Sequence, residues 1–119
     1  MFKELLQDVV ERTDGCTGAL VMGFDGIIVD HYLRDDATVD VETVGMEYSV
    51  ILKDIRRAAE QLSAGEAREI AIRAEAMTTV IRLLNAEYFV ALTIKPDGNA
   101  GKARYLLRSK AGEMLAQLA

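Results

Sequence analysis

One segment contains residue types that could bind a phosphate group. Gly98-Asn99-Ala100-Gly101-Lys102-Ala103 follows an apolar run and opens a helical pattern. A Walker loop needs four residues between its glycines and a serine or threonine directly after the lysine. Here two residues separate the glycines, and Ala103 has no hydroxyl group to bind Mg²⁺. We therefore interpret the segment as a turn followed by a helix cap, although such a helix terminus can hold an anion weakly.

Acid–base and nucleophilic catalysis are disfavoured by what surrounds the single histidine. Asp30 or Asp35 could pair with His31 as part of a general base, but the sequence supplies no third group to orient them. The candidate nucleophiles Ser49 and Ser63 lie in or just after a long helical segment. We interpret His31 as a surface residue at the end of a strand.

The sequence also argues against a metal site and a reactive thiol. Four aspartates lack the alternating spacing of a calcium-binding EF-hand loop; they are Asp25, Asp30, Asp35 and Asp36. The single cysteine, Cys16, excludes an internal disulfide and a cysteine-based zinc cluster, and we expect it to be buried. We expect a protein that is not an enzyme and has no catalytic residues, metal or cofactor.

Arginines are the most interesting charged residues of this acidic chain. They are Arg56, Arg57, Arg68, Arg73 and Arg82. A cluster of arginines can mark the site of an acidic partner. Neighbouring glutamates could equally balance a solvated surface, and we favour that interpretation unless the fold gathers the arginines.

Composition indicates one folded domain, which we expect to span residues 1–119. Of the 119 residues, 50% are hydrophobic and 28% are charged, and the formal net charge is −5. The negative charge disfavours non-specific binding to nucleic acid and anionic membranes, because both are polyanions. The longest apolar stretch, Tyr88 to Ile94, is far shorter than the roughly 20 residues of a membrane span. We expect no membrane insertion and a cytoplasmic location.

Hydrophobic periodicity predicts three helices and five strands. The expected helices begin at Phe2, run from about Asp40 to Leu62, and run from about Gly101 to Leu118. The expected strands are Gly18–Phe24, Ile27–Val29, Arg68–Ala74, Met77–Leu84 and Glu87–Ile94. Short connections make the strands antiparallel, and near-continuous apolar runs require helices on both faces of the sheet. The sequence therefore predicts an α+β fold, a three-layer α/β/α sandwich around a five-stranded antiparallel sheet.

The start and the packing of the long helix allow alternatives. Thr38 or Asp40 could cap its N-terminus. Gly45 costs about 1 kcal/mol relative to alanine, and a close approach by another helix or by the sheet would offset that cost. Met46 falls within an apolar pattern, as do Met22, Met77 and Met114, and we expect all four in the core.

The long helix carries an extended apolar stripe with the spacing of a coiled-coil seam. Its members are Val41, Val44, Tyr48, Ile51, Ile55, Ala58 and Leu62, and Leu52 widens it. The whole stripe could pack on the helix's own sheet. Part of it could instead contact the same helix of a second subunit. The strand Arg68–Ala74 favours a second subunit, since a short strand at the sheet edge can pair with its symmetry mate.

Taken in order, several of these segments resemble the Roadblock / dynein light chain 7 family, in its bacterial and archaeal MglB-like branch. The segments are Gly18-Ala19-Leu20-Val21, Asp25-Gly26, the long helix and Gly98–Tyr105. The resemblance covers Phe2 to Leu118. It implies the strand order 2-1-5-4-3, with the long helix on one face of the sheet and the terminal helices on the other.

The resemblance also implies partners. Family members form homodimers or pair with a paralogue, which assigns the dimer interface to Val44, Tyr48, Ile51, Leu52, Ile55, Ile70 and Ile72. Members bind Ras-like small GTPases as activators or scaffolds, which makes Glu47, Lys53, Asp54, Arg56 and Arg57 candidate GTPase contacts. Two alternatives stay open: a structural adaptor that ignores nucleotide, as motor light chains do, and a small-ligand sensor with a closed apolar cavity.

Overall fold

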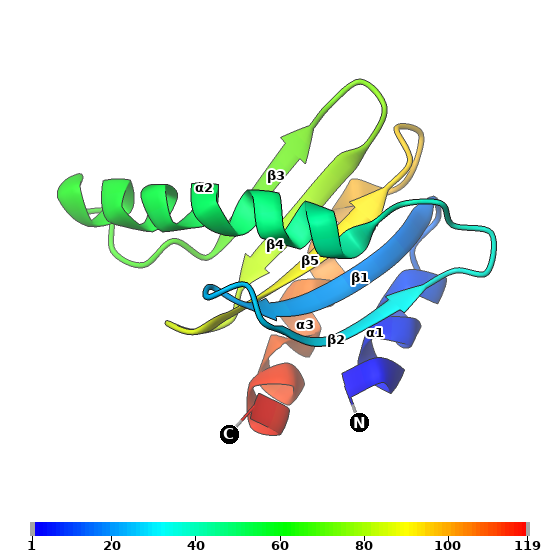
Figure 1. Ribbon diagram of the computed structural model, residues 1–119, viewed down its shortest axis with the longest axis horizontal. Coiled ribbons are helices and arrows are strands. Elements are labelled where there is room, and N and C mark those ends of the chain that lie inside the picture. The colour runs from blue at the N-terminus through cyan, green and yellow to red at the C-terminus, as the bar shows by residue number, and fades with distance from the viewer. Residues whose placement is uncertain (1, 119) are drawn as a thin grey trace.

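The computed structural model describes residues 2–118; Met1 and Ala119, the ends of the expected domain, lie outside the described residues. The elements are α1 (Phe2–Glu11), β1 (Cys16–Gly23), β2 (Ile28–Leu33), α2 (Val41–Gln61), β3 (Glu69–Arg73), β4 (Thr78–Leu83), β5 (Tyr88–Ile94) and α3 (Ala100–Leu118). The strands pair antiparallel in the order β2-β1-β5-β4-β3. Helix α2 crosses one face of the sheet, and α1 and α3 cover the other (Figure 1). The predicted fold class and strand order are confirmed.

Two hydrophobic cores lie on opposite faces of the sheet. The core beneath α1 and α3 includes Leu6, Val9, Leu106, Leu107 and Met114, all at most 1% exposed. The core beneath α2 includes Leu20, Met22, Leu52, Ile81 and Phe89. Because β1 and β5 are covered on both faces, their sequences read as continuous apolar runs rather than alternating ones.

Helix α2 begins at a side-chain cap, which decides between the two predicted starts. Asp40 has an extended backbone and accepts a hydrogen bond from the Thr43 backbone N–H at 3.2 Å. The Thr43 hydroxyl donates a second bond to the same carboxylate at 2.8 Å. These bonds favour the ionised form, so the pKa of Asp40 is lowered. Asp40, not Thr38, therefore satisfies the free N–H groups of the first turn.

Strand β2 continues four residues beyond the predicted end at Val29, so the prediction of a short second strand was wrong. His31 lies inside this strand, opposite Leu20, and not at its end. The strand lies at the sheet edge and is only partly buried, so polar residues interrupt its apolar pattern. After β2, the Arg34 guanidinium donates to the carbonyls of Cys16 at 2.6 Å and Val10 at 2.7 Å, which ties β2 to the end of α1.

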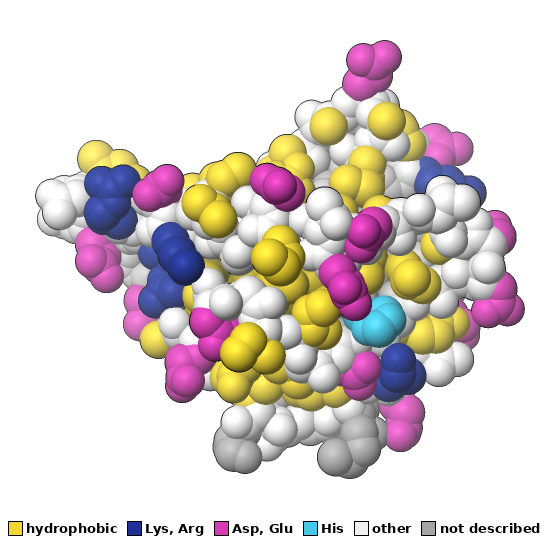
Figure 2. Space-filling view, viewed as in Figure 1, with side chains coloured by type: hydrophobic (Ala, Val, Ile, Leu, Met, Phe, Trp, Pro, Cys, Tyr) yellow, Lys and Arg dark blue, Asp and Glu magenta, His cyan; other side chains and the backbone are white. Residues whose placement is uncertain are grey.

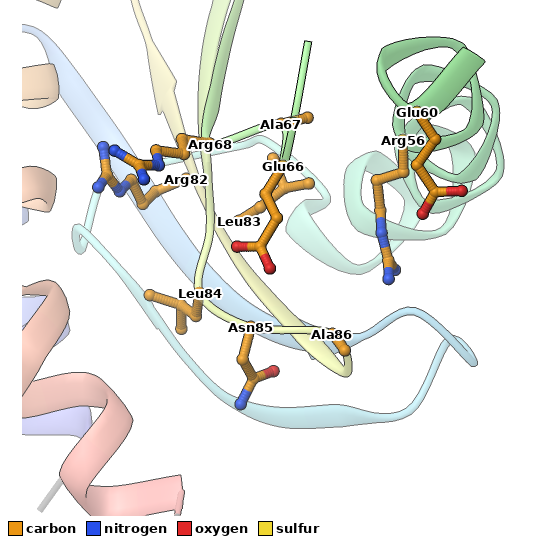
Figure 3. Close-up of a pocket in the computed structure, with 11 residues that line it drawn as sticks. Arg56, Glu60, Glu66, Ala67, Arg68, Arg82, Leu83, Leu84, Asn85 and Ala86 are labelled. Atoms are coloured by element: carbon orange, nitrogen blue, oxygen red, sulfur yellow. The ribbon is translucent and has the colours of Figure 1, made fainter. Parts of the chain in front are cut away.

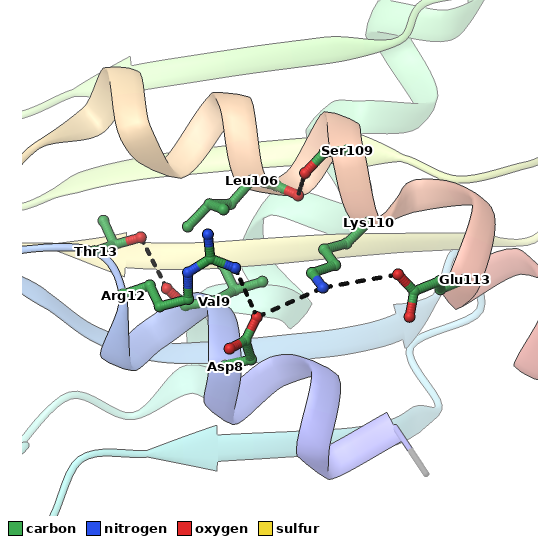
Figure 4. A network of polar contacts seen from close by, with 8 residues as sticks. All are labelled: Asp8, Val9, Arg12, Thr13, Leu106, Ser109, Lys110 and Glu113. Carbon is green, nitrogen blue, oxygen red and sulfur yellow. Dashed lines mark hydrogen bonds and ion pairs between the residues drawn. The ribbon is translucent and has the colours of Figure 1, made fainter.

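A small polar network links α1 to α3 at the surface (Figure 4). Asp8 pairs with Arg12 at 3.1 Å and with Lys110 of α3 at 3.6 Å. Lys110 also pairs with Glu113 at 3.7 Å. Such exposed pairs contribute about 0–1 kcal/mol each. The buried contacts between the helices and the sheet therefore dominate the stability of this layer.

Two glycines should respond in opposite directions to substitution by alanine. At Gly98 a Cβ atom would lie 2.8 Å from the Asp14 carbonyl oxygen, which the Asn99 N–H holds at 2.9 Å, and 2.4 Å from an Ile94 methyl group. We expect Gly98→Ala to cost about 1–3 kcal/mol. At Gly112, inside α3, no atom lies within 4 Å of the added Cβ, so Gly112→Ala should gain about 1 kcal/mol of helix propensity. Urea unfolding of both variants checks the two signs, and equal effects would contradict the packing described here.

The thiol of Cys16 should be inert in the folded protein. Cys16 is 1% exposed, and burial raises the pKa of its thiol from 9.0 to about 11. The unfolded chain releases the thiol proton near pH 9, whereas the folded chain holds it until about pH 11. The contribution of the neutral thiol to folding stability is therefore complete below pH 9 and is lost as the pH rises toward 11. Relative to Cys16→Ala, the wild type should therefore lose about 1 kcal/mol between pH 7 and pH 10. Urea unfolding at both pH values tests this, and identical pH dependence of the two proteins would contradict it.

Candidate interaction surface on α2 and β3

The first half of α2 is fixed tightly to its own sheet. Gly45 is buried, and a Cβ atom there would lie 2.3 Å from Leu20 Cδ2 and 2.8 Å from Met22 Cε. The sheet is thus the close neighbour that offsets the cost of a glycine in the helix. Leu52 is also buried against the sheet, with 1% exposure. These contacts fix which side of α2 faces outward.

The outward side of α2 exposes large apolar side chains. Val50 is 62% exposed, Met46 55%, Ile51 49%, and Leu62, at the C-cap, 77%. The prediction that Met46 belongs to the core was wrong, because the helix phase set by Gly45 and Leu52 turns Met46 away from the sheet. Figure 2 shows hydrophobic side chains gathered along α2 and over the neighbouring β3 and β4 region. Apolar surface of this kind is unusual on a protein that functions alone.

Most of the residues assigned to a dimer interface border this exposed side. Val44, Tyr48 and Ile55 are half-buried on one flank of α2. Ile70 and Ile72 are half-buried on the side of β3 that faces α2, next to its core. The exception is Leu52, whose side chain lies wholly within its own chain's core. Leu52 cannot contact a partner without opening that core, so its assignment to the interface needs correction. The surface formed by the outward side of α2, this flank and β3 is called the α2–β3 surface below.

Strand β3 supplies a sheet edge with free hydrogen-bonding groups. It is the last strand of the sheet and pairs only with β4. The Leu83 N–H donates to Arg68 O at 2.9 Å, and the Ala74 N–H donates to Met77 O at 3.0 Å. In an antiparallel ladder, bonded and non-bonded positions alternate. The backbone groups of residues 69, 71 and 73 therefore point away from β4, toward the open edge.

The candidate GTPase contacts fall on different sides of α2. Glu47 and Lys53 are exposed. Asp54 and Arg57 are 69% exposed and pair with each other at 3.2 Å. Arg56 is half-buried, and its guanidinium carbon lies 4.4 Å from the centre of the Phe24 ring. This cation–π contact holds Arg56 over the β1–β2 turn, whereas the other four candidates are exposed on the surface.

The fold gathers some of the arginines. Arg56, Arg68 and Arg82 line one surface groove of about 660 Å³, together with Glu60 and Glu66. Only Arg68 and Arg82 lie close to each other, because Arg56 is on the α2 side of the groove and they extend away from α2 (Figure 3). Arg57 and Arg73 are not among its lining residues. Two of the glutamates expected to balance the arginines, Glu60 and Glu66, line the same groove, so the groove carries both signs of charge. Sequence spacing could not reveal the cluster, because it forms between α2, the α2–β3 loop and β4.

The remaining chemical candidates have structural roles. Asn99 caps α3 by accepting a hydrogen bond from the Lys102 N–H at 3.0 Å, as expected for a turn and cap rather than a phosphate loop. Among residues 2–118, no three His, Cys, Asp or Glu side chains form a group that could hold a metal ion. No helix in the same range is long and apolar enough to cross a membrane. The α2–β3 surface is therefore the leading candidate for function.

Comparison with known proteins gives a structural match over almost the whole chain. No protein-family model and no curated protein matches it. The crystal structure of MglC from Myxococcus xanthus is 38% identical, with a TM-score of 0.71, and the match covers 98% of both chains. A Roadblock/LC7 domain from Streptomyces avermitilis gives a TM-score of 0.84 at 14% identity, covering 98% of this chain and 96% of the other. The gliding protein MglB from Thermus thermophilus gives 0.82 at 19% identity, covering 98% and 86%.

Proposed function

The chain belongs to the Roadblock/LC7 family, in its MglB-like branch, and from that premise we propose that it is a non-enzymatic, dimeric regulator or scaffold of a Ras-like small GTPase. The proposal places it in the cytoplasm, where such GTPases act. The observation that carries it is the α2–β3 surface, where exposed apolar side chains lie beside an open sheet edge. The opposite edge strand, β2, also has exposed apolar residues, Val29 and the neighbouring Ile27, but among the described residues it lacks the exposed apolar side of a helix beside it.

In the proposed dimer, two copies meet across a two-fold axis with β3 strands paired antiparallel. Only residues 69, 71 and 73 direct backbone groups outward, so these residues must face one another. With Ala71 on the axis, all three residues form hydrogen-bonded pairs between the two strands. Ala71 then lies opposite Ala71 of the second copy, and Glu69 of each copy lies opposite Arg73 of the other. With Ile72 on the axis, Glu69 would face Glu75, a like-charge pair. The register centred on Ala71 is therefore favoured.

On the other side of the sheet, the same register places Ile70 opposite Ile72 of the second copy. These side chains share the face that α2 covers. The two α2 helices would then lie alongside each other, with Ile51 and Ile55 between them. Burial of this surface removes the exposed apolar area, which stabilises a dimer by roughly 25 cal/mol per Å² before the cost of association.

The GTPase would bind where the paired α2 helices present charged side chains. Glu47, Lys53, Asp54 and Arg57 are exposed and suit contacts with a partner. In this proposal residues 2–118 supply no catalytic group, so an activating role would consist of positioning the catalytic groups of the GTPase. Positioning and electrostatic stabilisation account for most of the catalysis of phosphoryl transfer.

Affinity capture tests the proposal. The purified protein is immobilised and exposed to lysate of its source organism, once with a non-hydrolysable GTP analogue and once with GDP. We expect a Ras-like GTPase to be retained with the analogue and largely lost with GDP. Retention of other proteins regardless of nucleotide would instead identify an adaptor of the motor light-chain type and overturn the regulatory role.

A further inference from the structure

Arg68 and Arg82 form a pair of cations without an acidic partner. Arg68 directly precedes β3, and its carbonyl accepts the Leu83 N–H at 2.9 Å, which places it next to β4. Arg82 lies on β4 opposite Glu69. Figure 3 shows both side chains extending in the same direction, away from α2. Among residues 2–118, neither arginine makes an ion pair with a carboxylate of the chain.

The carboxylate opposite Arg82 is already occupied. Glu69 binds Arg104 of α3, with Nη2 at 2.6 Å and Nε at 2.8 Å from one carboxylate oxygen. That contact occupies one carboxylate oxygen of Glu69 with Arg104, and no ion pair among residues 2–118 joins a carboxylate to Arg68 or Arg82. Two adjacent guanidinium groups on a chain of net charge −5 form a local site for a carboxylate or another oxyanion.

The surroundings of the pair favour a peptide over a polyanion. Leu83, Leu84 and Ala86 line the same groove, and of these Leu84 lies on the side of the strand on which the arginines extend (Figure 3). Glu60 and Glu66 line its other parts, and the Glu66 carboxylate points into the groove (Figure 3). These carboxylates would repel nucleic acid or an anionic membrane, which present many negative charges at once. A segment with one or two acidic residues can bind the arginines without approaching the glutamates.

We propose that Arg68 and Arg82 form a docking site for an acidic segment of a partner protein. A carboxylate of the segment binds the two guanidinium groups, and an adjacent apolar side chain contacts the groove lining at Leu84, which lies on the same side of the strand as Arg82. The site is separate from the outward side of α2, so a partner bound there leaves that side accessible. It does not depend on the proposed GTPase.

A random library of 12-residue peptides displayed on phage tests the docking site. The library is selected against the immobilised full-length protein, and the most enriched peptide is synthesised with a fluorescent label. We expect enriched peptides to contain aspartate or glutamate beside an apolar residue. In fluorescence anisotropy, R68A/R82A should weaken binding at least tenfold, and replacing the peptide's acidic residues by their amides should weaken it equally.

Arg108→Ala is the matched control, because Arg108 is exposed on α3, where its guanidinium carbon lies 6.0 Å from the centre of the Tyr105 ring. It should change the affinity less than twofold. R68Q/R82Q, which keeps long polar side chains, guards against a folding defect in the alanine variant and should also weaken binding tenfold. Enrichment of peptides without acidic residues, or equal affinity in the arginine variants, would overturn the proposal. Full displacement by millimolar inorganic phosphate would assign the pair to a free anion instead.

Discussion

Replacing Ile51 by glutamate is expected to convert the proposed dimer to a monomer without unfolding the chain. Ile51 is 49% exposed in the single chain, so its carboxylate can be solvated there. In the proposed dimer the same side chain lies between two α2 helices, where an unpaired carboxylate costs several kcal/mol. Each dimer carries two such groups, so the dissociation constant should rise at least about 100-fold, the equivalent of about 2.7 kcal/mol.

Light scattering coupled to size-exclusion chromatography measures this change. Ile55→Glu should act in the same direction, since Ile55 lies on the same flank of α2. Val29→Glu is the matched control: Val29 is 41% exposed and lies on β2, at the opposite edge of the sheet. Circular dichroism should report the same helix content in all variants. If Ile51→Glu and Ile55→Glu both remain dimeric, the interface lies elsewhere.

Replacing Ala71 by proline should have a comparable effect through the backbone. Proline cannot donate a hydrogen bond, and edge strands tolerate it where the N–H group faces away from the sheet. The Ala71 N–H points to the open edge, so the β3–β4 ladder keeps its bonds, whereas pairing of two β3 strands loses a bond from each copy at its centre. We expect a monomer, because the lost bonds and the proline rings should raise the dissociation constant of the dimer at least about 100-fold.

Proline at Ile70 is the matched contrast for this variant. The Ile70 N–H points toward β4, so Ile70→Pro should disrupt the ladder within the chain and lower the melting temperature markedly. Ala71→Pro should leave the melting temperature of the monomer within a few degrees of the Ile51→Glu monomer. A dimeric Ala71→Pro variant would contradict pairing through β3.

Local signals in the sequence predicted most of the fold. Asp25-Gly26 marks the turn between β1 and β2, and the long periodic segment predicts α2 to within one residue at each end. The end of β2 was missed because this edge strand is only partly buried, and its Asp30-His31 pair breaks the alternation that identifies a strand.

The orientation of α2 could not be predicted from its sequence. Apolar residues cover so much of its circumference that several sides could equally face the sheet. The close approach of Gly45 to Leu20 and Met22 decides the phase. That phase buries Leu52, which the family resemblance had assigned to the dimer interface, and exposes Met46, which the apolar pattern had placed in the core. The proximity of Arg68 and Arg82 could not be predicted from the sequence either, because these residues come together only after β3 pairs with β4.

Titration of a Ras-like GTPase from the source organism into the purified protein tests the central proposal most directly. The GTPase is loaded with a non-hydrolysable GTP analogue in one experiment and with GDP in the other, and isothermal calorimetry measures affinity and stoichiometry. We predict binding to the GTP-analogue form at least about tenfold tighter than to the GDP form, a difference of about 1.4 kcal/mol, with the dimer as the binding unit. Equal affinity for the two forms, or no binding to either, would contradict a role as a nucleotide-dependent regulator.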